Sequence, residues 1–194
     1  MNKLIYLTLS FLLLMVLGAS WVIDKANSSR VLRKIKTVPN FSFINQNGQK
    51  FTNFNLKGSI SIIDFMFTNC PGPCPIMANN MKELYDDHSK VHQVQFISIT
   101  VDPKNDNIER LKQYSDSYGV NDIRWQFLTS QIDSIKDLKE NGFMLYADNL
   151  PQGHAVKFIL VDHNGMIRQY YDGTDKASIA VLRKDIKLLL KELL

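Results

Sequence analysis

Both cysteines of the chain lie where a predicted strand meets a predicted helix, and this junction constrains the fold more than any other feature. Cys70 and Cys74 are separated by three residues. The mostly apolar run 60–67 before them is typical of a buried strand, and apolar side chains within 76–84 recur at helical spacing. Backbone N–H groups and the positive dipole end at a helix start stabilise thiolates, so we expect lowered thiol pKa values here. Reactive sulfur is therefore predicted at a strand-to-helix turn.

The N-terminal segment is predicted to enter a membrane. Residues 4–23 are uncharged and mostly apolar, a run long enough to cross a bilayer as a helix. The small residues 18–20 suit a signal-peptide cleavage site, but the run is long for a signal, and the segment has no cysteine for lipid attachment. We therefore expect residues 1–23 to be an uncleaved membrane anchor and the polar, basic residues 24–38 to be a linker.

The charges beside this run bear on its orientation. Five Lys and Arg residues follow it within 13 residues, a pattern that by the positive-inside rule would keep the rest of the chain in the cytoplasm. Long domains after an N-terminal signal, however, translocate largely regardless of charge. We therefore expect the remaining domain to lie outside the cytoplasm.

The net charge of +4 comes from the N-terminal part. Residues 1–36 hold six Lys and Arg against one Asp, whereas residues 37–194 hold 17 against 18 Asp and Glu. The later part is nearly neutral and has no basic stripe interleaved with aromatic residues. We therefore expect no nucleic-acid partner.

The order of predicted elements in residues 39–194 indicates one α/β domain. Asn-Gly pairs at 47–48 and 164–165 are typical of tight hairpin turns. Strands are predicted at 41–44, 51–52, 59–67, 91–101, 125–128, 155–161 and 166–171, and helices from the cysteines to 88 and at 107–118, 130–141 and 177–194. The order β-α-β followed by β-β-α is that of the thioredoxin fold. The predicted fold is thus a thioredoxin-like mixed sheet flanked by helices, with an N-terminal β-hairpin and an N-terminal transmembrane helix.

Two cysteines at this spacing allow a structural disulfide, a redox dithiol or a metal site. A structural bridge around so short a loop would stabilise little, because its entropic effect grows with loop length. Redox dithiols of the thioredoxin type normally have two intervening residues, and this chain has three. Two thiolates are too few for a closed zinc site, which takes four Cys or His ligands. A metal site in this chain would therefore need at least one further ligand.

Four histidines are candidates for that ligand. His88 and His92 fall at a helix end and near the next strand, where solvated polar side chains are expected. His163 precedes an Asn-Gly pair and most simply begins a hairpin turn. His154 opens a late strand from the turn-rich loop 149–154, which in a thioredoxin-type sheet packs against the start of the active-site helix. The predicted fold therefore favours His154 among the four, although a lone histidine is more often structural or solvated.

Other side chains that suggest site chemistry have simpler structural interpretations. Asp102, followed by proline, is expected to begin a turn. Four methionines at helix or strand spacing suit core packing better than metal binding: Met66, Met77, Met81 and Met144. Three aromatic residues are interpreted as core or rim residues: Trp125, Phe143 and Tyr146.

Three segments resemble the SCO/SenC family. Residues 67–75, Phe-Thr-Asn-Cys-Pro-Gly-Pro-Cys-Pro, are similar to the family motif Phe-Thr-x-Cys-Pro-x-x-Cys-Pro. Residues 100–103, Thr-Val-Asp-Pro, are similar to its Ser-x-Asp-Pro strand end, and residues 154–165 resemble the segment in which a ligand histidine opens a strand. The resemblance covers roughly residues 39–194. Two departures are Gly153, where the family commonly has aspartate, and His163, where proline is frequent.

The resemblance implies a thioredoxin-fold copper protein that assists cytochrome c oxidase assembly. Cys70, Cys74 and His154 would be the metal ligands, and copper would be held as Cu(I), Cu(II) or both. Soft thiolates suit Cu(I), and oxidation to a disulfide would remove both sulfur donors. The protein would act as a metallochaperone for the CuA centre. Its partners would be oxidase subunit II or a related cuproprotein, an upstream copper donor, and the membrane; its domain would lie in the bacterial periplasm or at the outer face of the inner membrane.

Two redox alternatives remain open. The chain could be a thiol-disulfide oxidoreductase that keeps the copper-ligand cysteines of the oxidase reduced, with Cys70 attacking and Cys74 resolving. A thiol peroxidase or redox sensor on the same fold is the third interpretation. Whether the chain is an enzyme is therefore left open by its sequence.

Overall fold

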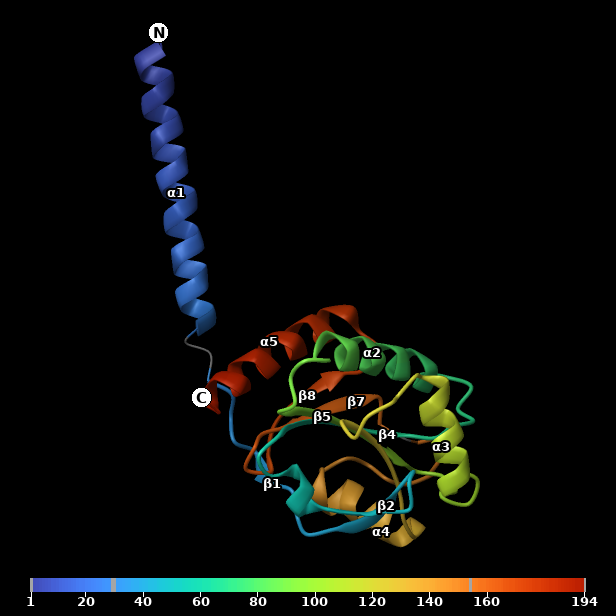
Figure 1. The fold of residues 1–194 in the computed structure, drawn as a ribbon. Coiled ribbons are helices and arrows are strands. Elements are labelled where there is room, and N and C mark those ends of the chain that lie inside the picture. The colour runs from blue at the N-terminus through green and yellow to red at the C-terminus, as the bar shows by residue number, and fades with distance from the viewer. Residues whose placement is uncertain (1, 29–30, 154, 194) are drawn as a thin grey trace. The chain divides into compact units, whose positions relative to one another are not determined.

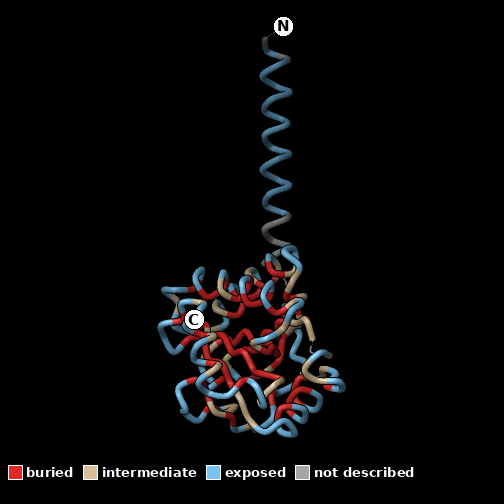
Figure 2. Tube along the Cα trace, turned by 90° about the vertical axis from the view of Figure 1, so that its right-hand side faces the viewer, coloured by how far each residue is buried: buried red, intermediate tan, exposed pale blue. Residues whose placement is uncertain are grey.

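The computed structural model describes residues 2–28, 31–153 and 155–193, which form two compact units, residues 1–32 and 33–194 (Figure 1). The first unit is helix α1, Asn2–Ser28. Its stretch Ile5–Val22 is long and apolar enough to cross a membrane, and none of it is buried within the protein (Figure 2). The helix ends at Ser28, so the first residues of the predicted linker are helical.

The second unit is built on one eight-stranded sheet with the order β1-β8-β7-β4-β5-β6-β2-β3. The central strands β4, β5 and β6 are parallel, and the other pairings are antiparallel. The strands are β1 Lys36–Thr37, β2 Ser42–Asn45, β3 Lys50–Thr52, β4 Ile60–Met66, β5 Val94–Thr100, β6 Trp125–Thr129, β7 Lys157–Val161 and β8 Met166–Asp172. The mixed sheet agrees with the predicted fold class.

Helices cover both faces of this sheet (Figure 1). They are α2 Cys74–Asp87, α3 Ile108–Ser117, α4 Ile132–Asp137 and α5 Lys176–Glu192, with a 3-10 helix η1 Asn53–Leu56 and a π-helical turn η2 Leu138–Gly142. Helices α2 and α5 lie side by side, joined by ion pairs from Lys176 and Arg183 to Glu83. Phe143, directly after η2, packs against Phe65 with ring centroids 5.6 Å apart.

The central strands form the core because apolar side chains point to both of their faces. Every residue of β4 is buried, and so are all but one of β5. Such burial on both faces is typical of parallel strands covered by helices. The parallel register, from Ile60 opposite Val94 to Met66 opposite Thr100, brings the carboxyl ends of β4 and β5 to one sheet edge. The loops that follow these strands therefore meet.

The predicted hairpin turns are confirmed. Gly48 and Gly165 have φ angles of +74° and +77°, which glycine adopts without strain. They lie in the turns that join β2 to β3 and β7 to β8. The first hairpin completes one end of the sheet, where Ile44 pairs with Thr129 of β6.

Two short elements were not predicted. Strand β1 lies within the expected linker and pairs with β8, Lys36 opposite Ile167; two residues are too few to show a periodic pattern. Helix η1 begins with a reciprocal capping interaction in which the Asn55 side chain accepts from the Thr52 N–H at 2.8 Å. The Thr-x-x-Asn spacing is a variant of the capping-box signal.

Two predicted side-chain environments were wrong. His88 was expected in solvent, but it is 6% exposed, and its Nδ1 lies 2.8 Å from the Leu84 carbonyl oxygen. Met144 was expected in the core, but it is 48% exposed at a backbone φ of +53°. The other three methionines are buried, as are Trp125 and Phe143, whereas Tyr146 is exposed.

Candidate metal and redox site

The two cysteines lie in and after the loop that joins β4 to α2. Cys70 is partly exposed, and its N–H donates to the Phe67 carbonyl at 3.3 Å. Cys74 is the first residue of α2 and is 2% exposed. Both are thiols, and the Cys70 side chain is hydrogen-bonded to that of Cys74. The predicted strand-to-helix turn is thus confirmed, and it brings the two sulfurs together.

The expected lowering of the thiol pKa is wrong for Cys74. Burial is the largest cause and raises the pKa of Cys74. A hydrogen bond from the Phe67 backbone opposes this rise, whereas the Cys70 side chain and the charge of Asp64 add to it. The helix start is therefore outweighed by desolvation, and Cys74 remains protonated near neutral pH in the metal-free domain.

Asp64 is a buried carboxyl group within β4. It is 3% exposed, and its register partner on β5, Ser98, is hydrogen-bonded to it. Within the described part of the chain, its Oδ1 atom has no hydrogen-bond partner. Burial raises the pKa of Asp64 from 3.8 to about 7. Sequence reasoning missed this group, although an aspartate inside the apolar run 60–67 was its signal.

Asp106 is fully buried in the loop after β5. It contacts the cysteine loop, which is the segment of residues 67–73 between β4 and α2. Its carboxylate accepts hydrogen bonds from the Thr68 N–H at 3.1 Å, the Thr68 hydroxyl at 2.6 Å and the Thr100 hydroxyl at 2.5 Å. Arg110 of α3 donates to the Thr68 hydroxyl and to the Asn69 side chain, both at 3.1 Å. Sequence reasoning did not identify Asp106 or Arg110, because their partners are about 40 residues away in the chain.

Asp102 begins a turn, as predicted. Its carbonyl oxygen accepts from the N–H groups of Asn105 and Asp106, and its carboxylate accepts from the Asn105 side chain at 2.7 Å. These contacts fix the conformation of the turn that precedes Asp106, whose carboxylate accepts hydrogen bonds from the cysteine loop.

His154, the predicted third ligand, lies outside the described residues. The strand that follows it, β7, pairs antiparallel with β4, with Ile159 opposite Ile63 and Val161 opposite Ser61. The amino end of β7 and the carboxyl end of β4 consequently lie at the same sheet edge. The described residues 155–156, directly before β7, therefore lie at the sheet edge that holds the cysteine loop.

The other histidines lie elsewhere. His88 is held in the core, and His92 is exposed. His163 belongs to the β7–β8 turn, at the opposite end of β7 from Lys157, and its Nε2 is 2.9 Å from the Asn164 side-chain nitrogen. Across the described ranges, no group of three or more His, Cys, Asp or Glu side chains is arranged to hold a metal ion. The described His, Cys, Asp and Glu side chains therefore do not form a three-ligand site by themselves.

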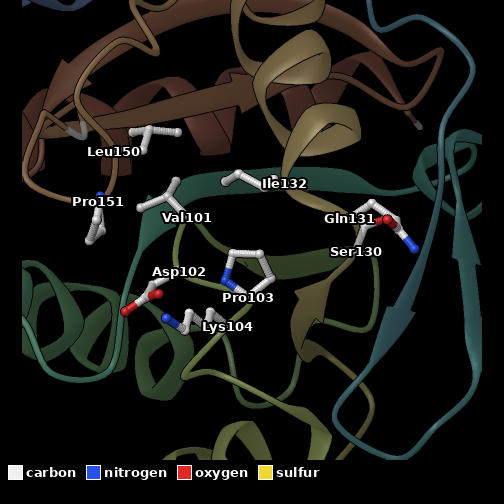
Figure 3. Close-up of a pocket in the computed structure, with 9 residues that line it drawn as sticks. All are labelled: Val101, Asp102, Pro103, Lys104, Ser130, Gln131, Ile132, Leu150 and Pro151. Carbon is white, nitrogen blue, oxygen red and sulfur yellow. The ribbon is translucent and has the colours of Figure 1, made fainter.

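A surface pocket of about 500 Å³ lies beside this sheet edge (Figure 3). Leu150 and Pro151, from the loop before residue 154, lie across from the loop that begins at Val101. The lining residues are Val101, Asp102, Pro103, Lys104, Ser130, Gln131, Ile132, Leu150 and Pro151. The pocket thus separates the Asp102 turn from the segment that leads to His154.

Gly153 is required by the close packing of its loop. Its N–H donates to the Asn149 carbonyl at 2.9 Å, and a Cβ atom at this position would lie 2.5 Å from the Asp148 backbone oxygen. The loop in this conformation therefore excludes the aspartate that the family commonly has here. This contact gives a physical reason for the departure noted in the sequence.

We predict that Gly153→Asp opens the loop at 148–153. The backbone must move to relieve the 2.5 Å approach, so cleavage within this loop by a dilute protease should become several-fold faster. Gln152→Asp is the matched control because it adds the same charge at the neighbouring exposed position. Equal cleavage rates for the two variants would contradict the prediction.

Comparison with known proteins identifies one family. The SCO1/SenC family model matches residues 30–191. The chain is 30% identical over 186 residues to the SCO1 protein homolog of Bacillus subtilis (strain 168), an alignment that covers 92% of each chain. It is also similar to the solved structure of a SCO1/SenC family lipoprotein from Bacillus anthracis, with 32% identity and a TM-score of 0.75 over 82% of this chain and 99% of that one. This likeness confirms the thioredoxin-like fold.

Two further solved structures bear on chemistry. BsSco, described as a Sco-family cytochrome c oxidase assembly protein with a disulfide switch, has 28% identity and a TM-score of 0.71 over 81% of this chain and 95% of its own. Yeast Sco1 with copper bound has 26% identity and a TM-score of 0.64 over 79% of this chain and 90% of its own. One similar protein is thus known with copper bound, and another is described as having a disulfide switch.

Proposed function

Because this chain belongs to the SCO1/SenC family, we propose that it binds copper through Cys70, Cys74 and His154 and delivers it to the CuA centre of cytochrome c oxidase. The observation that carries the proposal is the pair of interacting thiols at one sheet edge: Cys70, partly exposed in the loop after β4, and Cys74, buried at the start of α2. Copper here is cargo, received from an upstream donor and passed to oxidase subunit II or a related cuproprotein.

The donor set suits copper. Thiolate sulfur selects Cu(I), and two sulfurs with one imidazole leave an approach open for a recipient. The partly exposed Cys70 supports such an exchange, whereas the buried Cys74 supports retention. Because burial keeps Cys74 protonated, copper loading must release a proton there, and oxidation to a disulfide would remove both sulfur donors.

His154 as third ligand is supported by the sheet topology. Strand β7 begins at Lys157, at the edge where β4 ends, so only Ala155 and Val156 separate His154 from the start of a strand that pairs with β4. On the other side of His154 in the sequence, the loop 148–153 is closely packed, with the Gly153 N–H donating to the Asn149 carbonyl at 2.9 Å. These two neighbouring segments support the assignment of His154 as the third ligand.

The N-terminal helix supports a membrane anchor. Its apolar stretch Ile5–Val22 is exposed throughout and long enough to span a bilayer. We propose that residues 1–23 anchor the chain, residues 24–38 connect it to the domain of residues 39–194, and this domain lies on the extracytoplasmic side, in the periplasm or at the outer face of the inner membrane. The described relative from Bacillus anthracis is a lipoprotein, which fits membrane attachment in the family.

Copper titration of the reduced full chain in detergent tests the proposal. We expect one copper ion per chain, with a thiolate-to-copper charge-transfer band when Cu(II) is added. Because the chain holds only two cysteines, Cys70→Ser and Cys74→Ser should each weaken binding strongly, and the double variant should lose the band. A double variant that still binds one equivalent with wild-type affinity would overturn the proposal.

A thiol-disulfide oxidoreductase is the second candidate, favoured by the unequal exposure of the two hydrogen-bonded thiols. Cys70 would attack a substrate disulfide, such as that of oxidised copper-ligand cysteines in the oxidase, and Cys74 would then resolve the mixed disulfide. Cys70 and Cys74 would end as a disulfide while the substrate gains two thiols. This function requires both cysteines but not His154.

A further inference from the structure

We propose that Asp106 is a positioning residue for the copper site. Its carboxylate fixes the position of Thr68 and Asn69 in the cysteine loop and thereby sets where the Cys70 sulfur lies relative to that of Cys74. The inference rests on the proposed copper-binding function and extends it to residues of the neighbouring loop and helix.

The carboxylate of Asp106 is held against Thr68 by hydrogen bonds. It is fully buried, and both of its oxygens accept hydrogen bonds from the Thr68 side chain or backbone. Its Oδ2 atom also accepts from the Thr100 hydroxyl at the end of β5. Hydrogen bonds to a buried carboxylate are stronger than those between neutral groups, so they restrict Thr68 to one position.

Thr68 transmits this position to both cysteines through its neighbour Phe67. The Phe67 carbonyl accepts the Cys70 N–H at 3.3 Å, and the Phe67 backbone is hydrogen-bonded to the Cys74 sulfur. A displacement of Thr68 therefore moves the residue that contacts both members of the pair.

Arg110 of α3 also holds Thr68 and Asn69 in position. Its Nε donates to the Thr68 hydroxyl, which in turn donates to Asp106, and its terminal nitrogen donates to Asn69, the residue directly before Cys70. The Asn107 side chain caps helix α3, so that Asp106, just before the helix, and Arg110, in its first turn, lie close together. The cysteine loop is thus held by the loop before α3 and by the first turn of this helix, neither of which contributes a proposed metal ligand.

The test compares Thr68→Val with Thr68→Ser in the full chain in detergent. Valine has nearly the shape of threonine but removes the hydroxyl, whereas serine keeps it. We expect Thr68→Val to lower copper affinity 10- to 100-fold, the range typical of residues that orient metal ligands, and to shift the charge-transfer band. It should also change the alkylation rate of Cys70 in the copper-free chain several-fold. Thr68→Ser should restore all three readouts.

Tyr171→Phe is the matched control because it removes a hydroxyl that donates at 2.7 Å to another fully buried carboxylate, that of Asp185. It should leave copper affinity and Cys70 alkylation unchanged. Arg110→Met serves as a second variant if Thr68→Val does not fold, and it should change both readouts in the same direction.

The outcomes separate this inference from the proposed function. If the wild-type chain binds no copper but Thr68→Val alters Cys70 alkylation, the copper function fails and the positioning role stands. If wild-type and Thr68→Val chains bind copper and react with alkylating reagent equally, the positioning role is overturned. Equal losses in Thr68→Val and Tyr171→Phe would also overturn it, because they would reflect general destabilisation.

Discussion

Replacement of His154 by alanine is expected to abolish stable copper loading while thiol-disulfide exchange continues. Of the four histidines, His88 is committed to the core, His92 is exposed, and His163 lies in a turn at the far end of β7. None of these three histidines is therefore placed to substitute for the lost imidazole. Because residues that only orient ligands already account for 10- to 100-fold in affinity, loss of a ligand should exceed about 100-fold. Copper stoichiometry and a competitive chelator titration of the reduced chain measure the effect.

His92→Ala is the matched control because it removes an imidazole from the surface, and it should bind copper as the wild type does. The rate at which each variant reduces a small disulfide substrate is measured in parallel. Retained exchange together with lost copper binding would support the metallochaperone. Copper binding that survives His154→Ala, together with reductase activity that falls, would instead contradict the ligand assignment.

The sequence predicted those parts of the fold that local patterns encode. The buried strand before Cys70 follows from a continuous apolar run, and the hairpin turns at Gly48 and Gly165 follow from Asn-Gly pairs that favour positive φ angles. The strand-to-helix turn that carries the cysteines needed only the change from one periodicity to the other. In each case the determining residues are neighbours in the chain.

Long-range polar contacts could not be predicted in the same way. Asp106 and Arg110 contact the cysteine loop across about 40 residues of sequence, and no local pattern specifies such pairing. The pKa of Cys74 was predicted in the wrong direction because a helix start is visible in sequence, whereas the depth of burial is not. For His88, a position at a helix end suggested solvent, but the helix packs that end against the sheet, with the ring 6.5 Å from that of Phe96.

Asp64→Asn is expected to stabilise the reduced, copper-free chain above neutral pH. The pKa of Asp64 is raised from 3.8 to about 7 in the folded domain, so between these values the folded state holds a proton that the unfolded state has lost. Wild-type stability should therefore fall as the pH rises from about 4 to about 7, by at most about 4 kcal/mol for this group. Asparagine carries no charge and can still bond to Ser98, so the variant should lack this decline.

Urea unfolding of both chains between pH 4.5 and 8.5, with a reductant present, checks this expectation. The difference in unfolding free energy should be small at pH 4.5 and should grow to favour Asp64→Asn by pH 8. Asp133→Asn is the matched control, because it removes the same charge from the surface and should stay within about 1 kcal/mol of the wild type throughout. The ionised Asp64 also helps to keep the Cys74 thiol protonated, so its removal should speed Cys74 alkylation at pH 8. Parallel stability curves for the wild type and Asp64→Asn would show that the carboxyl group is ionised at neutral pH without cost, and that burial does not raise its pKa.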